Sequence, residues 1–153
     1  MTLDQIFRNR IMPKARDRVD RSIAMNFRQG GRPEKWKPSQ RALRTGSGKT
    51  LIDTGILVNS INTRIATESK LIASTPTKYA KAHNDGFSGT VSVKSHNRLI
   101  RQAFGRPIEP KEINIKAHQR NMNLPKREFM MLQTSDVEYF SKMIQQELSN
   151  ELF

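Results

Sequence analysis

The sequence predicts an α+β protein in which N- and C-terminal amphipathic helices pack against a mostly antiparallel sheet. Apolar residues recur at helical spacing near both ends of the chain, and short segments rich in Ile, Thr and Val lie between them. Helical ends around a central β region are typical of this class. At 153 residues, the chain is long enough for one domain with its own core, so we expect a single domain, 1–153.

Residues 1–29 predict an N-terminal helical segment. Its apolar residues follow one another at every fourth position: Phe7, Ile11, Ala15, Val19, Ile23 and Phe27. We expect Pro13 to interrupt the helix, giving a short helix, a kink and a longer helix that ends before Gly30-Gly31. The opposite face is basic, which indicates either a solvated surface or one that meets another subunit or a polyanion.

The segment 30–61 predicts an extended loop followed by a short capped helix. The only Trp of the chain, Trp36, lies between two prolines, and we expect it to anchor the loop by packing. Asp53 and Thr54 are good N-cap residues, and Gly55 permits a tight turn before the apolar Ile56. A helix cap is therefore the preferred interpretation of Asp53, ahead of a catalytic carboxylate.

A hairpin and a helix are expected next. Segments 62–67 and 70–75 are rich in Ile, Thr and Ala and are separated by Glu68-Ser69, which predicts two strands joined by a tight turn. Pro76 should end the second strand. Residues 77–85 then have helix-forming content, with Gly86 as the C-cap.

The range 87–123 predicts an extended hairpin and loop region, with strands at 90–94 and 112–118 and a Gly/Pro-rich excursion at 105–110. Within it, the pattern of β-branched residue, Lys, small residue, His, amide and Arg occurs twice. If the two copies pair as strands, they form a projecting basic hairpin that touches DNA or a neighbouring protein; a coincidental match between exposed strands is the alternative. The six basic residues are Lys94, His96, Arg98, Lys116, His118 and Arg120.

The last helix is predicted by a capping box that begins at Ser135 and ends at Glu138. Apolar residues follow it at helical spacing: Phe140, Ile144, Leu148 and Leu152.

The net charge of +13 indicates attraction to polyanions, although a generally basic, soluble surface would also explain it. The chain has no Cys, which excludes disulfides and thiolate metal sites. It shows neither a secretory signal pattern nor an apolar run long enough to cross a bilayer, so we expect a protein made in a cytoplasm, with no membrane association.

No catalytic, cofactor or metal site is expected. The segment 46–50, Gly-Ser-Gly-Lys-Thr, resembles part of a phosphate-binding loop, but Leu43 stands where that loop requires Gly. His96 and His118 would need a third ligand that no nearby carboxylate or thiol supplies. We expect His83 to be a structural histidine whose ring hydrogen-bonds to backbone, and we expect no enzyme activity.

Four segments in order resemble the tailed-phage virion morphogenesis family, the tail-completion proteins. They are the Trp36 loop, the Asp53–Gly55 turn, a Tyr-Ala-x-x-His-x-x-Gly segment, and a Pro-x-Arg-x-Phe segment before the last helix. In this chain the last two patterns place Tyr79, His83 and Gly86, and then Pro125 and Phe129. The chain departs most from the family between Phe87 and Asn123.

The resemblance implies a structural protein of tail completion and head–tail joining. Its partners would be copies of itself in a ring at the head-proximal end of the tail (a hexamer is one such ring) and the tail tube and neck or connector proteins. It would be located in the virion after assembly in the host bacterial cytoplasm, and non-specific DNA contact is a further implication. The alternative is a small basic nucleic-acid-binding protein, although only 7% of the residues are aromatic and none of the familiar DNA-reading motifs occurs.

Overall fold

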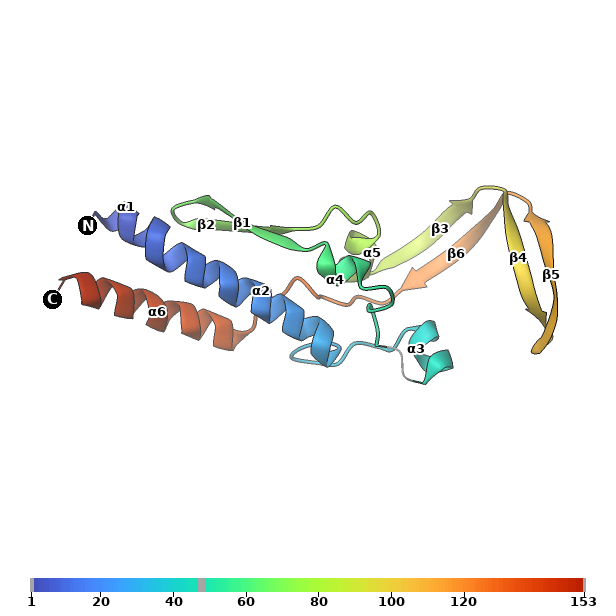
Figure 1. Ribbon diagram of the computed structural model, residues 1–153, viewed down its shortest axis with the longest axis horizontal. Helices are drawn as coiled ribbons and strands as arrows, with labels where there is room; N and C mark the ends of the chain where they lie inside the picture. Colours follow the sequence, from blue (N-terminus) through green and yellow to red (C-terminus); the bar gives the residue numbers. More distant parts are fainter. Residues whose placement is uncertain (1, 47–48, 153) are drawn as a thin grey trace. The chain divides into compact units, whose positions relative to one another are not determined.

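The computed structural model describes residues 2–46 and 49–152, apart from the side chains of Thr45 and Leu152. Helices at both ends and antiparallel strands between them confirm the α+β class (Figure 1). The chain divides into two compact units, Met1–Gly86 with Pro125–Phe153, and Phe87–Leu124. The second unit covers the range that the sequence marks as an extended hairpin region.

The N-terminal segment is helical from Leu3 to Gln29, in three parts: α1 (Leu3–Ile6), the π-helix η1 (Phe7–Ile11) and α2 (Met12–Gln29). Pro13 lies at the start of α2 and has no backbone N–H to donate. The hydrogen bonding widens just before it, so that the N–H of Met12 reaches the carbonyl of Phe7. Such π-turns insert into α-helices without ending them, and the expected interruption is therefore a change of helical type. Gly30, with φ of 69°, ends α2.

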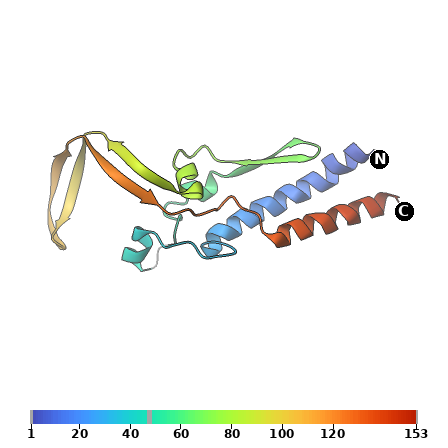
Figure 2. The same ribbon diagram turned by 180° about the vertical axis from the view of Figure 1, so that it is seen from behind.

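The long helix α6 (Thr134–Leu152) lies alongside the N-terminal helices in both views (Figures 1 and 2). Side chains from the N-terminal helices and from α6 form one apolar cluster. In it Ile11, Ala15 and Met143 are buried, and Phe140 packs beside them. Ion pairs flank this seam, between Arg10 and Glu151 at 2.6 Å and between Lys14 and Glu147. The periodicities predicted for both helices are confirmed, although the side chain of Leu152 lies outside the described residues.

The start of α6 differs from the predicted capping box. Its helical residues begin at Thr134, and the carboxylate of Asp136 accepts the backbone N–H of Gln133 at 2.8 Å. Asp136 is 1% exposed and also accepts hydrogen bonds from Arg18 Nε, at 2.7 Å, and from the Ser22 hydroxyl. The prediction of Ser135 as N-cap is wrong because the first turn of α6 packs on α2, where the buried acid meets donors from another helix.

A second apolar cluster surrounds the end of α2. The Phe27 ring lies 5.1 Å from the Phe129 ring and 5.8 Å from the Trp36 ring, which meets it edge-on. The Trp36 loop turns tightly, and the Trp36 N–H donates to Gly30 O at 2.8 Å. A Cβ on Gly31 would lie 2.5 Å from Glu34 O, so only glycine fits there. Trp36 thus packs on the core, in the position expected of an anchor.

Truncation of Trp36 tests this packing. Because its ring is half-buried, Trp36→Ala should lower the free energy of unfolding by about 2–4 kcal/mol, measured by denaturant titration. Trp36→Phe keeps an aromatic ring against Phe27 and should lose less than half as much. An unchanged free energy in Trp36→Ala would mean that the loop does not depend on this contact.

The first hairpin has the predicted strands and turn: β1 (Asn62–Thr67) pairs antiparallel with β2 (Lys70–Ser74) across Glu68-Ser69. The hairpin contacts α2. Leu71 and Ala73 pack against the apolar cluster around Phe27, and the buried Thr63 lies near residues of α2. The described residues of this unit also form the short helices α3 (Gln40–Thr45), α4 (Ile56–Asn59) and α5 (Ala80–Asp85). The last of them begins three residues later than expected and ends at Gly86, as predicted.

The remaining strands are β3 (Phe87–Val93), β4 (His96–Ala103), β5 (Arg106–Ile115) and β6 (His118–Leu124). Together with β1 and β2 they form three separate two-stranded ladders, so the expectation of one sheet is wrong. The predicted strand 112–118 is also wrong, since the pairing changes from β5 to β6 within it. Strand pairing is set by distant partners, which a local pattern does not specify.

Candidate functional site

Three of the segments that the sequence singles out meet around one cavity of the first unit, with a volume of about 330 Å³. The turn before α4, the helix α5 and the segment after Pro125 each contribute lining residues. The polar and charged ones include Arg41, Asp53, Thr54, Tyr79, His83 and Arg127. The structure therefore brings together motifs that lie up to 74 positions apart, from Asp53 to Arg127.

Asp53 is not the cap of α4, and this prediction is wrong. The N-cap position is Gly55, with φ of 81°, and no side chain caps the helix. The Asp53 side chain is 71% exposed and lies 3.5 Å from Arg41 Nη1. Gly55 turns the chain between Asp53 and the one-turn helix, and the Asp53 carboxylate lines the cavity without capping the helix.

Arg127 is the most buried charged residue of the cavity, at 4% exposure. Its Nε donates to Lys37 O at 3.1 Å, and its backbone N–H donates to His83 O at 2.9 Å. No carboxylate forms an ion pair with it among the residues that the structure describes. Burial lowers the pKa of the guanidinium from its usual value, although an arginine stays charged at neutral pH. Sequence reasoning missed Arg127, although it lies within the Pro-x-Arg-x-Phe pattern.

His83 lies beside Arg127 and presents an unsatisfied nitrogen. Its Nδ1 is buried and has no hydrogen-bond partner in the structure, so the predicted ring-to-backbone hydrogen bond is wrong. The Tyr79 ring packs against the imidazole edge-on, with centroids 5.8 Å apart. Burial, and then the positive charge of Arg127, lower the pKa of His83, which keeps the ring neutral at pH 7.

The segment that carries Arg127 is held rigidly on both sides. The Asn84 side-chain oxygen accepts the backbone N–H groups of Phe129 and Met130, at 3.2 and 3.1 Å. From the other side, Asn26 Nδ2 donates to Phe129 O at 2.9 Å and to Met131 O at 2.8 Å. The Phe129 ring is fully buried, so both backbone hydrogen bonds and core packing anchor the segment that carries Arg127. Pro125, the first residue of this pattern, lies at the start of the segment and does not line the cavity.

The second candidate is the unit Phe87–Leu124, which we call the ribbon. Val93 faces His118, and three residues farther along both strands His96 faces Ile115, so the register does not change between the two ladders. The ladders are thus successive parts of one two-stranded ribbon, which bends where the pairing is interrupted (Figure 1).

The internal repeat marks this bend. In the first copy His96 Nδ1 lies 3.0 Å from Lys94 O, and in the second His118 Nδ1 lies 2.9 Å from Lys116 O. The two copies therefore share one local structure on opposite strands. The two similar sequences thus adopt the same contact between a histidine ring and the backbone carbonyl two residues before it.

The two copies of the basic repeat do not pair with each other, so the predicted hairpin, in which all six basic residues would lie on one face, is wrong. The register places Arg98 opposite Ile113 and Arg120 opposite Val91, so each arginine has an apolar cross-strand neighbour. His96 and Arg98 belong to the β4–β5 ladder, whereas His118 and Arg120 belong to the β3–β6 ladder. Like charges are thereby separated, and all six side chains remain exposed.

The ribbon ends in an exposed aromatic residue. Phe104 and Gly105 form the two-residue turn between β4 and β5, with φ of 49° and 76°. Positive φ at both positions is the mirror-image turn that suits hairpin twist, and it is uncommon for Phe. The Phe104 side chain has a relative exposure of 105%.

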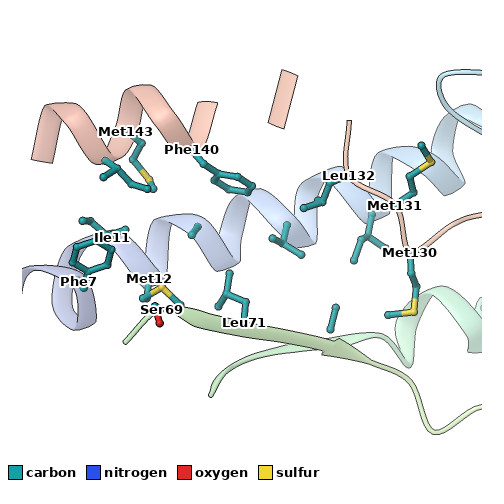
Figure 3. A pocket seen from close by; sticks show the side chains of 15 residues that line it. Phe7, Ile11, Met12, Ser69, Leu71, Met130, Met131, Leu132, Phe140 and Met143 are labelled. Atoms are coloured by element: carbon teal, nitrogen blue, oxygen red, sulfur yellow. The ribbon is translucent and has the colours of Figure 1, made fainter. Parts of the chain in front are cut away.

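The first unit also carries an open apolar groove of about 660 Å³. Figure 3 shows side chains from η1 and α2, from α6, from Ser69 and β2, and from the segment 130–132 around it. Four of its lining residues are methionines: Met12, Met130, Met131 and Met143. Methionine side chains adapt to irregular apolar surfaces.

Comparison with known proteins gave no family model, no curated protein and no solved structure that matches this chain. In the described parts of the chain, no cluster of His, Asp and Glu has the composition of a metal site. None of the described helices is long and apolar enough to cross a membrane. The phosphate-loop-like segment 46–50 includes Ser47 and Gly48, which lie outside the described residues.

Proposed function

We propose that this chain is a structural phage or prophage protein of tail completion and head–tail joining. It assembles as a homo-oligomeric ring at the head-proximal end of the tail, where it contacts the tail tube and the neck or connector proteins in the virion. The ordered resemblance of four segments supports this role. A ring requires that one surface of each copy meets a different surface of the next.

The observation that carries the proposal is the lack of a core in the ribbon. None of the residues Phe87–Leu124, all of which the structure describes, is buried. A two-stranded antiparallel ribbon is marginally stable in water by itself. One face of its first ladder carries Phe87, Val91, Val93, Met122 and Leu124, and a surface of this kind is stabilised when a neighbouring molecule covers it.

The charge of the ribbon suits an anionic neighbour. It has seven Lys or Arg residues and two Glu residues, a net charge of +5 out of the +13 of the chain. Either the acidic surface of a virion protein or passing DNA would complement this charge. Enzyme activity and a bound cofactor form no part of the proposed role.

The oligomeric state tests the proposal directly. Sedimentation analysis of the full chain at rising concentration should show one closed species several times the monomer mass. A chain that stays monomeric, and that binds one nucleic-acid sequence tightly, would instead be a nucleic-acid-binding protein, the alternative that the charge suggests.

Neutralising the ribbon should separate assembly from folding. With Lys94, Arg98, Lys116 and Arg120 all changed to Gln, we expect an unchanged far-UV spectrum and melting temperature, since all four side chains are exposed. Joining of tails to heads should be impaired, and the salt dependence of polyanion binding should become shallower.

A matched control removes the same charge from the first unit. Its four exposed residues Arg21, Arg28, Lys70 and Lys78 are changed to Gln. This control should join tails to heads as the wild type does. Equal impairment in both variants would mean that net charge matters and that the ribbon has no special part in assembly.

A further inference from the structure

The cavity beside α5 holds a positive charge, that of Arg127, with which no carboxylate of the described residues forms an ion pair. Arg127 is 4% exposed, and its printed side-chain bond uses only Nε, which donates to a neutral carbonyl. The two terminal nitrogens of the guanidinium form no hydrogen bond in the described structure, and Arg127 lines the cavity. An arginine buried without a counter-charge is strongly destabilising, so this arrangement favours an anionic ligand.

The second polar group at the same place is also unsatisfied. His83 Nδ1 is buried without a partner, and the carbonyl of the same residue accepts the N–H of Arg127. A neutral imidazole with its proton on Nδ1 is a hydrogen-bond donor. The cavity is therefore lined by a buried cation and by a histidine with an unused ring nitrogen.

The other walls restrict the kind of anion. Leu51, Ile56 and Leu57 supply an apolar lining, which suits a methylene stem. The carboxylate of Asp53, near Arg41, adds a negative charge that disfavours a doubly charged phosphate more than a singly charged carboxylate. The planar fork of Arg127 matches the two oxygens of a carboxylate.

We propose that this cavity binds the side-chain carboxylate of an acidic segment of a partner protein, a glutamate-like group whose stem lies against the apolar wall. One oxygen pairs with the Arg127 guanidinium and the other accepts a hydrogen bond from His83. The site lies wholly in the first unit. Its occupation does not depend on ring assembly, so the proposed function and this inference can fail separately.

The test uses small probes with the full chain at constant ionic strength. N-acetyl-glutamate amide carries the carboxylate, and N-acetyl-glutamine amide is its neutral match. NMR of the imidazole signals should show saturable shifts of His83 alone with the glutamate probe and none with the glutamine probe. Saturation by neither probe, or by both alike, would overturn the proposal. Equal or tighter binding of inorganic phosphate would overturn the choice of a carboxylate.

Variants locate the site. Arg127→Gln should lower the affinity for the glutamate probe by at least about tenfold, which is the usual loss when a hydrogen bond to a charged group is removed. His83→Gln keeps Arg127 and should weaken binding by about threefold to tenfold. If Arg127→Gln does not fold, His83→Gln supplies the decisive result. The control Arg64→Gln removes an exposed charge on β1 and should leave the affinity within about twofold. Unchanged binding in both cavity variants would show that the anion binds elsewhere.

Discussion

Asp136→Ala should lower the free energy of unfolding by about 3–5 kcal/mol at pH 7, the usual cost of breaking a buried charge pair. The carboxylate is 1% exposed and receives hydrogen bonds from Arg18, Ser22 and the Gln133 N–H. Its removal leaves those donors unsatisfied between α2 and α6. Denaturant titration measures the loss. Because Arg18 keeps partial contact with solvent, a value at the lower end of the range is expected.

The same carboxylate should make stability depend on pH. Burial alone would raise its pKa, but the hydrogen bonds from Ser22 and Gln133 and the charge of Arg18 outweigh burial, so the pKa of Asp136 is lowered. The folded state thus favours the ionised form. The stabilisation is complete above the unfolded pKa of about 3.9 and is lost as the pH falls through the lower folded pKa.

Asp136→Asn isolates this contribution. The difference in stability between the wild type and Asp136→Asn should be large at pH 7 and should shrink as the pH falls below about 4. Asp20→Asn, at an exposed position on α2, should change stability little at either pH. A difference for Asp136→Asn that stays constant with pH would mean that the ionised form is not preferred by the fold.

Phe129→Ala should also cost about 3–5 kcal/mol, as expected for truncation of a core aromatic residue. The ring is 0% exposed and packs on Phe27, and its backbone is held by Asn26 and Asn84. These hydrogen bonds resist collapse around the vacated space, so a cavity should remain. Urea denaturation gives the change in the free energy of unfolding.

Two controls accompany Phe129→Ala. Phe129→Leu keeps most of the volume and should cost about 1–2 kcal/mol. Val137→Ala shortens an apolar side chain that is 58% exposed on α6, and it should change stability by less than about 0.5 kcal/mol. A loss for Phe129→Ala no larger than that for Val137→Ala would show that the ring is not part of a packed core.

Several elements follow from the sequence because their causes are local. Apolar residues at every fourth position from Ile11 to Phe27 define one face of a helix, and this does not depend on which element packs against that face. The first hairpin is set by two short apolar segments and a two-residue turn, and Gly30 and Gly86 end helices by their positive φ. These signals lie within a few residues, so their interpretation needs no knowledge of the fold.

Other features depend on partners far along the chain, and local reasoning about them failed. Asp53 has the chemistry of a cap but contacts Arg41, whereas Asp136 forms its strongest contacts with Arg18 and Ser22 on another helix. The basic repeat is visible in the sequence, but only the pairing with β5 and β3 decides which residues lie opposite its two copies. Side-chain chemistry specifies what a residue can do, and packing selects among those options.

By itself, the sequence determined the fold class, the two amphipathic helices, the first hairpin and the basic character of the range 87–124. Only the tertiary structure decided that Arg127 and His83 share one cavity, because the hydrogen bond between them joins residues separated by the whole ribbon. It also decided that the strands form separate ladders. Contacts of this kind are fixed by the simultaneous burial of distant segments, a constraint that no short stretch of sequence contains.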